Sequence, residues 1–99
     1  DQSSAASDVY KRQVLTELDK LQSMKQDTEE LILFLEEEWR KTRKVLDANN
    51  SVGLDNPTRI MVEKKMLDAR SNFERGAYQQ SRSEMGEADE GIESLRRLV

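Results

Sequence analysis

The chain of 99 residues contains no cysteine and no histidine. Without these residue types it cannot form a disulfide, a thiolate or imidazole metal site, a cysteine nucleophile or a Ser-His-Asp relay. The missing cysteines leave the cellular compartment undetermined, because a secreted helical protein without disulfides has the same count as a cytosolic one. The longest apolar run, residues 31–35, is far shorter than the roughly 20 residues that cross a bilayer. The sequence therefore predicts no membrane span.

Proline occurs once and aromatic residues make up 5% of the chain, so helix breakers and strand-forming residues are both scarce. Charged residues make up 36% and hydrophobic residues 35%, with a net charge of only −4. The abundant residues, among them Glu, Lys, Arg, Leu and Gln, favour helices. Basic residues alternate with acids, and the isoelectric point is about 4.9, which argues against nucleic acid as a partner. We predict an all-α protein.

A spacing of four and three residues runs along the first half of the chain and predicts one long amphipathic helix over about 14–49. Its apolar seam consists of Val14, Leu18, Leu21, Lys25, Thr28, Ile32, Leu35, Trp39, Thr42 and Leu46. A flank of Leu15, Met24, Leu31, Phe34 and Val45 widens this seam. Trp39, the single tryptophan, is expected to anchor the core.

Two shorter helices are predicted to follow. Asn56 and Pro57 are typical of a helix start, so we expect a helix over about 57–75 with a seam of Val62, Met66, Ala69 and Phe73, and with Ile60 and Leu67 alongside. Gly76 is expected to end it in a tight turn, although one continuous helix of about 40 residues is the alternative. The last helix, about 78–98, has a seam of Tyr78, Ser81, Met85, Ala88, Ile92, Leu95 and Val99, and its helix propensity is lowered by Gly86 and Gly91.

The predicted fold is an antiparallel helical hairpin or three-helix bundle with one long helix and two shorter ones. At a rise of 1.5 Å per residue the first helix is about 54 Å long and the other two about 30 Å each, so the first must extend past them. This overhang, about 14–24, has no partner for its apolar side chains within the chain. We therefore expect a partner-binding stripe, formed by Leu15, Leu18, Leu21 and Met24.

Residues 3–13 resemble the in-frame translation of a common transposase-type sequencing adapter, SSAASDVYKRQ, codon for codon. We expect residues 1–13 to be a non-native tail, either disordered or extending the first helix. Residues 14–99 are then expected to form a single helical domain. Because the apolar spacing of the last predicted helix continues up to Val99, that domain is expected to be a fragment of a longer protein.

No catalytic, cofactor-binding or metal-binding residues are predicted. The loop 47–58 has oxygen-bearing residues at several positions of a calcium loop, but Val52 and Thr58 replace the required Gly and Glu. Acidic runs such as 36–38 are expected to form a solvated face with intrahelical pairs, Glu37 with Lys41 and Glu36 with Arg40. No small-molecule ligand is expected.

Around residue 76 the chain carries small and aromatic residues at characteristic spacings, namely Ala69, Phe73, Gly76, Tyr78, Ser81, Met85 and Ala88. This pattern resembles the second half of a tetratricopeptide-type helical hairpin. Together with Val45–Ala48, Gly53–Asp55 and Leu67–Arg70, it resembles over 45–97 the TPR-like three-helix spacer modules of prokaryotic, notably archaeal, surface and signalling proteins. Asp68-Ala69 stands where tetratricopeptides have Leu-Gly, and no repeat of roughly 34 residues is visible. The resemblance implies a packed spacer or interaction module without catalytic residues.

These observations predict a structural or protein–protein interaction module rather than an enzyme. Two alternatives stay open: a homo-oligomerising coiled-coil segment, and an accessory helical domain of a larger sensor or enzyme. For the interaction module the overhang is the expected contact surface for another subunit or for a missing part of the chain, and for the coiled-coil segment it is the contact with a second copy. The sequence does not indicate a compartment.

Overall fold

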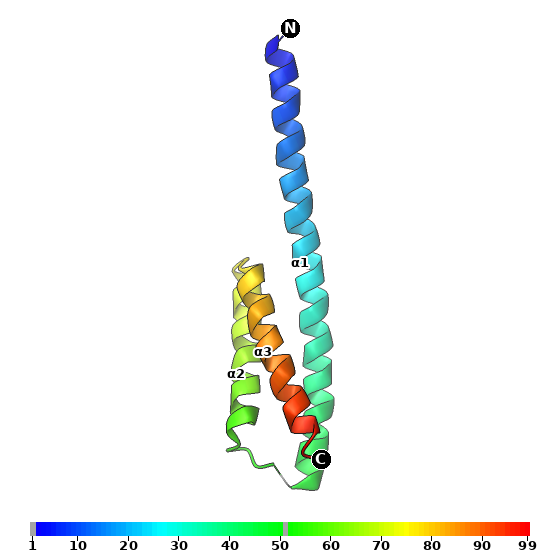
Figure 1. The fold of residues 1–99 in the computed structure, drawn as a ribbon, viewed down its shortest axis with the longest axis vertical. Coiled ribbons are helices and arrows are strands. Elements are labelled where there is room, and N and C mark those ends of the chain that lie inside the picture. The colour runs from blue at the N-terminus through cyan, green and yellow to red at the C-terminus, as the bar shows by residue number, and fades with distance from the viewer. Residues whose placement is uncertain (1, 51) are drawn as a thin grey trace.

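A computed structural model describes the backbone of residues 2–50 and 52–99, and the side chains of residues 11–50 and 52–99. The described chain contains three helices and no strand: α1 (Gln2–Asn49), α2 (Pro57–Glu74) and α3 (Tyr78–Arg96). Helices α2 and α3 form an antiparallel hairpin that lies along one end of α1 (Figure 1). The predicted all-α fold, with one long helix and two shorter ones, is confirmed.

The helix boundaries differ from the predicted ones at three ends. Helix α1 begins at Gln2, so residues 2–13 extend the helix that was expected from residue 14, as one of the two expectations for this tail had it; α2 ends at Glu74 instead of residue 75, and α3 ends at Arg96 instead of residue 98. The expected non-native tail, residues 1–13, lies mostly outside the residues whose side chains the structure describes. The end of α1 at Asn49 agrees with the prediction, and Asn50 follows in a left-handed conformation with a φ of 55°.

The start of α2 is stabilised by Asn56. Its side-chain oxygen accepts hydrogen bonds from the backbone N–H of Thr58, at 2.9 Å, and of Arg59, at 3.2 Å. Pro57 occupies the first helical position, where no backbone donor is needed. Two of the unpaired donors of the first turn are thereby satisfied.

Replacing Asn56 by alanine should lower the free energy of unfolding by about 1 kcal/mol, because alanine offers no acceptor to those donors. Urea denaturation followed by circular dichroism would measure the loss. Asp55→Ala is a suitable control, since Asp55 is exposed in the same loop and does not cap the helix. Equal losses in the two variants would contradict a capping role for Asn56.

The connection between α2 and α3 is a tight turn at Gly76. This glycine has a φ of 81°, a conformation that side-chain-bearing residues rarely adopt, and Ala77 donates its backbone N–H to the carbonyl oxygen of Asn72 at 2.8 Å. The rings of Phe73 and Tyr78 lie on either side of the turn, with centroids 5.5 Å apart. Helices α2 and α3 are therefore separate, and the alternative of one continuous helix is wrong.

The core lies between the C-terminal half of α1 and the α2–α3 hairpin. Every seam residue of α1 from residue 28 onward is buried: Thr28, Ile32, Leu35, Trp39, Thr42 and Leu46. Both threonines on this seam form hydrogen bonds: Thr28 donates to the carbonyl oxygen of Met24 within α1, and Thr42 accepts from Nε of Arg96 on α3. Trp39 is 6% exposed, which confirms its expected place in the core.

The predicted seams of the hairpin are correct at most positions. In α3 the buried residues include Ser81, Met85, Ala88, Ile92 and Leu95, but Val99 lies beyond the helix and is exposed. In α2, Val62 and Ala69 are buried and Met66 and Phe73 are partly buried, whereas Ile60 and Leu67 are exposed.

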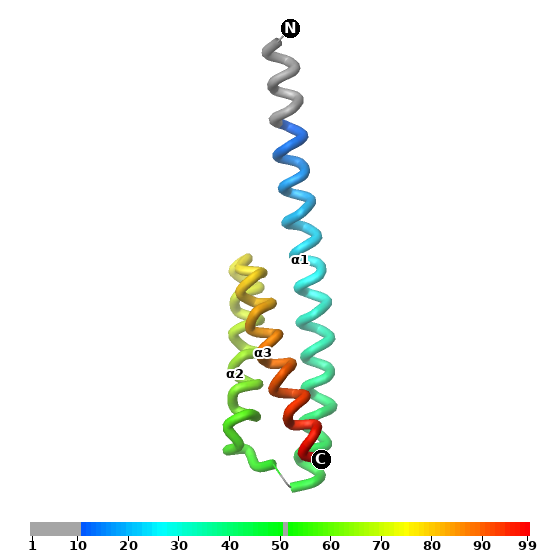
Figure 2. Tube along the Cα trace, in the orientation of Figure 1, coloured from blue at the N-terminus to red at the C-terminus, as the bar shows by residue number. Residues whose placement is uncertain are grey.

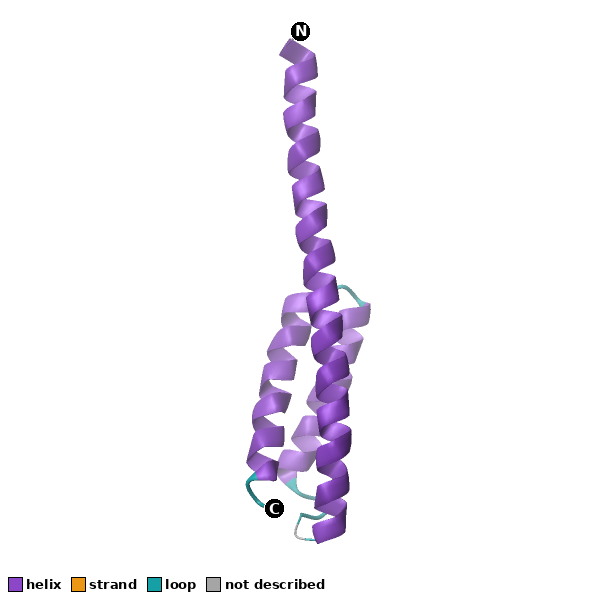
Figure 3. Cartoon of the chain, turned by 90° about the vertical axis from the view of Figure 1, so that its right-hand side faces the viewer, coloured by secondary structure: helices purple, strands orange, loops and turns teal. Residues whose placement is uncertain are grey.

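Helix α1 extends well beyond the hairpin. The molecule measures 74 × 17 × 17 Å, and in Figure 2 no other helix of the described chain accompanies the blue-to-cyan part of α1 above the turn between α2 and α3. The view turned by 90° shows the same arrangement, with both hairpin helices beside the lower half of α1 only (Figure 3). The structure thus places an unsupported helical segment next to a small three-helix bundle.

Candidate interaction surface

The unsupported part of α1 carries the predicted apolar stripe. Leu15, Leu18 and Leu21 are 60%, 54% and 55% exposed. Met24, the fourth predicted member, is half-buried, because it lies where α1 meets the end of the hairpin. From Thr28 onward the seam is buried against the hairpin, so the stripe and the core are two parts of one apolar face, of which only the second is covered.

The N-terminal end of the stripe, at Leu15 and Leu18, does not point in the same direction as the core. An α-helix turns by five full turns in about 18 residues, so Leu15 and Leu18 share their sides of α1 with Leu33 and Glu36. A seam with a seven-residue repeat drifts by about 20° per heptad around a straight helix. The drift turns the exposed stripe toward the side of α1 on which α2 lies, where Glu36 pairs with Arg70 of α2.

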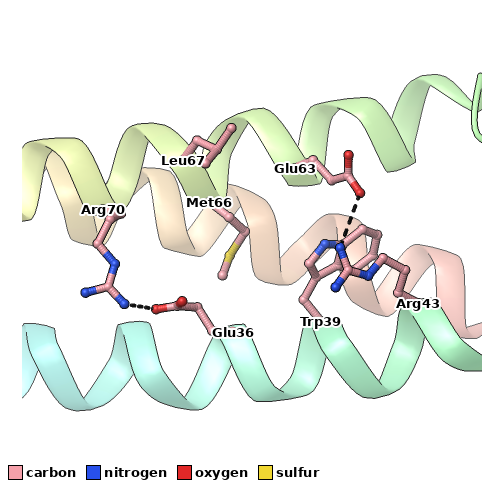
Figure 4. A pocket seen from close by; sticks show the side chains of 7 residues that line it. All are labelled: Glu36, Trp39, Arg43, Glu63, Met66, Leu67 and Arg70. Carbon is pink, nitrogen blue, oxygen red and sulfur yellow. Dashed lines mark hydrogen bonds and ion pairs between the residues drawn. The ribbon is translucent and has the colours of Figure 1, made fainter.

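On that same side, α1 and α2 are separated by a groove of about 390 Å³. Trp39 and Met66 contribute its apolar floor, and Leu67, which is 72% exposed, lies at its lip. Two ion pairs cross the groove, Arg70 with Glu36 and Arg43 with Glu63, with Met66 between them (Figure 4).

The surface charges pair differently from the prediction. Glu37 is bonded to Arg40 at 2.6 Å instead of to Lys41, and Glu36 is bonded to Arg70 across the groove instead of to Arg40. The hydrogen bond from Arg40 lowers the pKa of Glu37 from its ordinary value. The two expected intrahelical pairs are therefore wrong. Glu37 pairs with the residue three positions further along α1 instead of four, and the partner of Glu36 comes from α2.

Sequence reasoning missed the buried Arg59, which is 3% exposed in the first turns of α2. Its Nη2 lies 2.8 Å from Oδ1 of Asp47, near the end of α1. Among the described residues its Nε and Nη1 have no hydrogen-bond partner. Asp47 belongs to the loop that superficially matches a calcium site, and here it joins the end of α1 to the start of α2.

A second buried polar cluster, also missed, joins α2 to α3 near the turn. Asn72 donates from its side-chain amide to Glu84, which is 5% exposed, and accepts from Arg75. One carboxylate oxygen of Glu84, Oε2, has no hydrogen-bond partner among the described residues. The only sequence signal for the cluster of Asn72, Arg75 and Glu84 is that Glu84 lies directly beside the seam residue Met85.

On the outer surface of the same hairpin, Lys65 is hydrogen-bonded to Glu87, which raises the pKa of the lysine.

Within the described side chains, no group of three or more Asp or Glu residues is arranged to hold a metal ion. None of the helices, over the part of the chain that was described, is both long enough and apolar enough to cross a membrane. The candidate binding features of the described surface are the exposed stripe of Leu15, Leu18 and Leu21 and the nearby groove between α1 and α2.

Comparison of the chain with protein-family models, with curated proteins and with solved structures gave no match.

Proposed function

We propose that this chain is a non-enzymatic helical interaction module that binds another polypeptide through the exposed stripe of α1. The observation that carries the proposal is the exposure of Leu15, Leu18 and Leu21 on one face of an unsupported helix. Contiguous exposed apolar side chains of this kind mark interaction sites. An isolated helix of this length is also marginal in water, so a bound partner would stabilise it.

The α2–α3 hairpin supports the idea of a spacer or scaffold similar to TPR-like modules. Small residues let its helices approach closely, and Ser81 donates from its hydroxyl to the carbonyl oxygen of Ala69 at 2.7 Å. The aromatic pair of Phe73 and Tyr78 beside the Gly76 turn also supports this comparison. In this proposal the hairpin holds one half of α1 rigid and presents the other half.

The test compares association of the wild-type chain with that of Leu18→Glu. A buried carboxylate on the stripe should abolish binding to any polypeptide held there, whether a second copy or a different protein. Ser23→Glu is the matched control, because it adds the same charge to an exposed position on another face of the same segment. Molar mass in solution and affinity capture with each variant would measure the effect, with circular dichroism to verify helicity.

We expect Leu18→Glu to lose associations that Ser23→Glu retains, with little change in helicity. If every association of the wild-type chain survives in Leu18→Glu, the stripe is not an interaction surface and the proposal is wrong.

A further inference from the structure

We propose that the occupant of the stripe is an amphipathic helix of another polypeptide that lies in line with α2 and carries an acidic residue opposite Lys25. This inference rests on the proposed function and specifies the chemistry of the partner. On the side of α1 that faces α2, the overhang repeats a pattern of side chains that α2 itself covers further along the same helix.

The repeat follows from the pitch of the α-helix. Five full turns take about 18 residues, so residues at this spacing lie on the same side of α1, about 27 Å apart. Leu21 therefore corresponds to Trp39, and Lys25 corresponds to Arg43. Trp39 is 6% exposed in the covered half, whereas Leu21 is 55% exposed in the overhang. The overhang thus presents an apolar residue and a cation one turn after it, as the covered half does.

The covered half shows how α2 accommodates this pattern. Met66 of α2 lies with Trp39 on the floor of the groove, and Oε1 of Glu63 lies 3.9 Å from Nη1 of Arg43 (Figure 4). Glu63 and Met66 are three residues apart in sequence, so they share one face of α2. A helix that covers the overhang with the orientation of α2 therefore needs an apolar residue and, three residues before it, an acidic one.

The charged residues of α1 beside the core are generally matched by the hairpin. Four ion pairs join the described part of α1 to α2 or α3: Glu36 with Arg70, Glu38 with Arg96, Arg43 with Glu63 and Asp47 with Arg59. A helix that packs against α1 in this chain thus supplies opposite charges as well as apolar surface.

Lys25 lacks the partner that Arg43 has. It is exposed and forms no ion pair with a described residue. It is also the only charged residue of the predicted α1 seam, and covering an ammonium group without an acceptor is strongly unfavourable. An occupant of the stripe therefore has to supply a carboxylate at this level. The stripe of a second copy contains no acidic residue, so it does not complement Lys25.

The side of the overhang that corresponds to the α3 contact requires no second helix. At the same spacing, Glu17 corresponds to the buried Leu35. Lys20 corresponds to Glu38, which pairs with Arg96 of α3. Glu17 and Lys20 instead pair with each other at 3.5 Å, and their side chains are 71% and 69% exposed. This side is charged and paired within α1, so the occupant is one helix rather than a pair of helices.

The experiment measures the binding of two synthetic helical peptides to the full chain. Both peptides have leucines along one face and differ only three residues before a central leucine, where one has Glu and the other has Lys. We expect the wild-type chain to bind the Glu peptide about tenfold more tightly, because the Lys peptide replaces an attraction to Lys25 by a repulsion. Lys25→Glu should reverse this preference, and Lys25→Met should bind the two peptides equally. Fluorescence anisotropy of labelled peptide gives each dissociation constant, with circular dichroism to verify helicity.

Lys44→Glu is the matched control. Lys44 is also exposed and forms no ion pair with a described residue, but it lies about 100° around α1 from Lys25. This variant should keep the wild-type preference, whereas Leu18→Glu should weaken the binding of both peptides.

Absence of binding, equal binding of the two peptides by the wild-type chain, or a preference that Lys25→Glu leaves unchanged overturns the acidic helix as occupant. If Leu18→Glu still loses the associations of the wild-type chain in that case, the proposed function stands without this inference. If those associations survive, both are wrong. Self-association of the wild-type chain that Leu18→Glu abolishes and the Glu peptide does not displace makes a second copy the occupant, and it also overturns this inference.

Discussion

Leu35→Ala should lower the free energy of unfolding by about 2–5 kcal/mol, the range for removing a buried leucine from a well-packed core. Leu35 is 2% exposed and lies where α1 meets the hairpin. A small domain of this length has a total stability of only about 0.05–0.15 kcal/mol per residue. The variant should therefore be substantially unfolded under conditions in which the wild-type chain is folded, as thermal and urea melting would show.

Its neighbour provides the control. Phe34 is the larger side chain, but it is 59% exposed, so Phe34→Ala should cost clearly less than Leu35→Ala. The comparison tests the rotational position of α1 directly, because the two residues differ by about 100° around the helix. If Phe34→Ala were the more damaging variant, the face of α1 that packs on the hairpin would be assigned wrongly.

The seam of α1 could be predicted from the sequence because a periodic apolar pattern needs no knowledge of the partner. The six predicted seam residues from Thr28 to Leu46 are all buried. The pattern could not show where burial stops, since the exposed Leu21 and the buried Leu35 have the same place in the repeat. That boundary depends on the lengths of α2 and α3, which the turn residues Asn56 and Gly76 fix.

The hairpin was harder to predict because its contacts include polar side chains. Arg59, Asn72 and Glu84 are buried, and each depends on a partner distant in sequence or on another helix. Conversely, Ile60 and Leu67 are apolar but exposed. Residue type alone would predict that these polar side chains are exposed and that Ile60 and Leu67 are buried. The groove between α1 and α2 likewise arises from the relative positions of two helices, and no local pattern indicates it.

Gly86 and Gly91 of α3 show this limit of sequence-based prediction most clearly. From the sequence, both glycines were expected only to lower the helix propensity of α3. An ideal Cβ at Gly91 would lie 2.5 Å from Cγ2 of Val62 and 2.8 Å from Cε of Met61, whereas a Cβ at Gly86 would meet nothing within 4 Å. Val62 is fully buried and β-branched, so it has little freedom to move. Gly91 is therefore required by the close approach of α2 and α3.

Alanine substitutions at these two positions should consequently have opposite effects. Gly86→Ala should raise the free energy of unfolding by about 1 kcal/mol, the difference in helix propensity between the residues. Gly91→Ala gains the same propensity, but the overlap with Val62 has the cost of overpacking, typically about 1–3 kcal/mol, and forces α2 and α3 apart. We expect a net loss of stability for Gly91→Ala and a difference in the free energy of unfolding between the two variants of about 1–3 kcal/mol, measured by urea denaturation.

The double variant Gly91→Ala with Val62→Ala provides the control. It should recover part of the propensity gain relative to Val62→Ala alone, because the shortened side chain removes the overlap. Stabilisation by both single substitutions would contradict the close packing of α2 against α3.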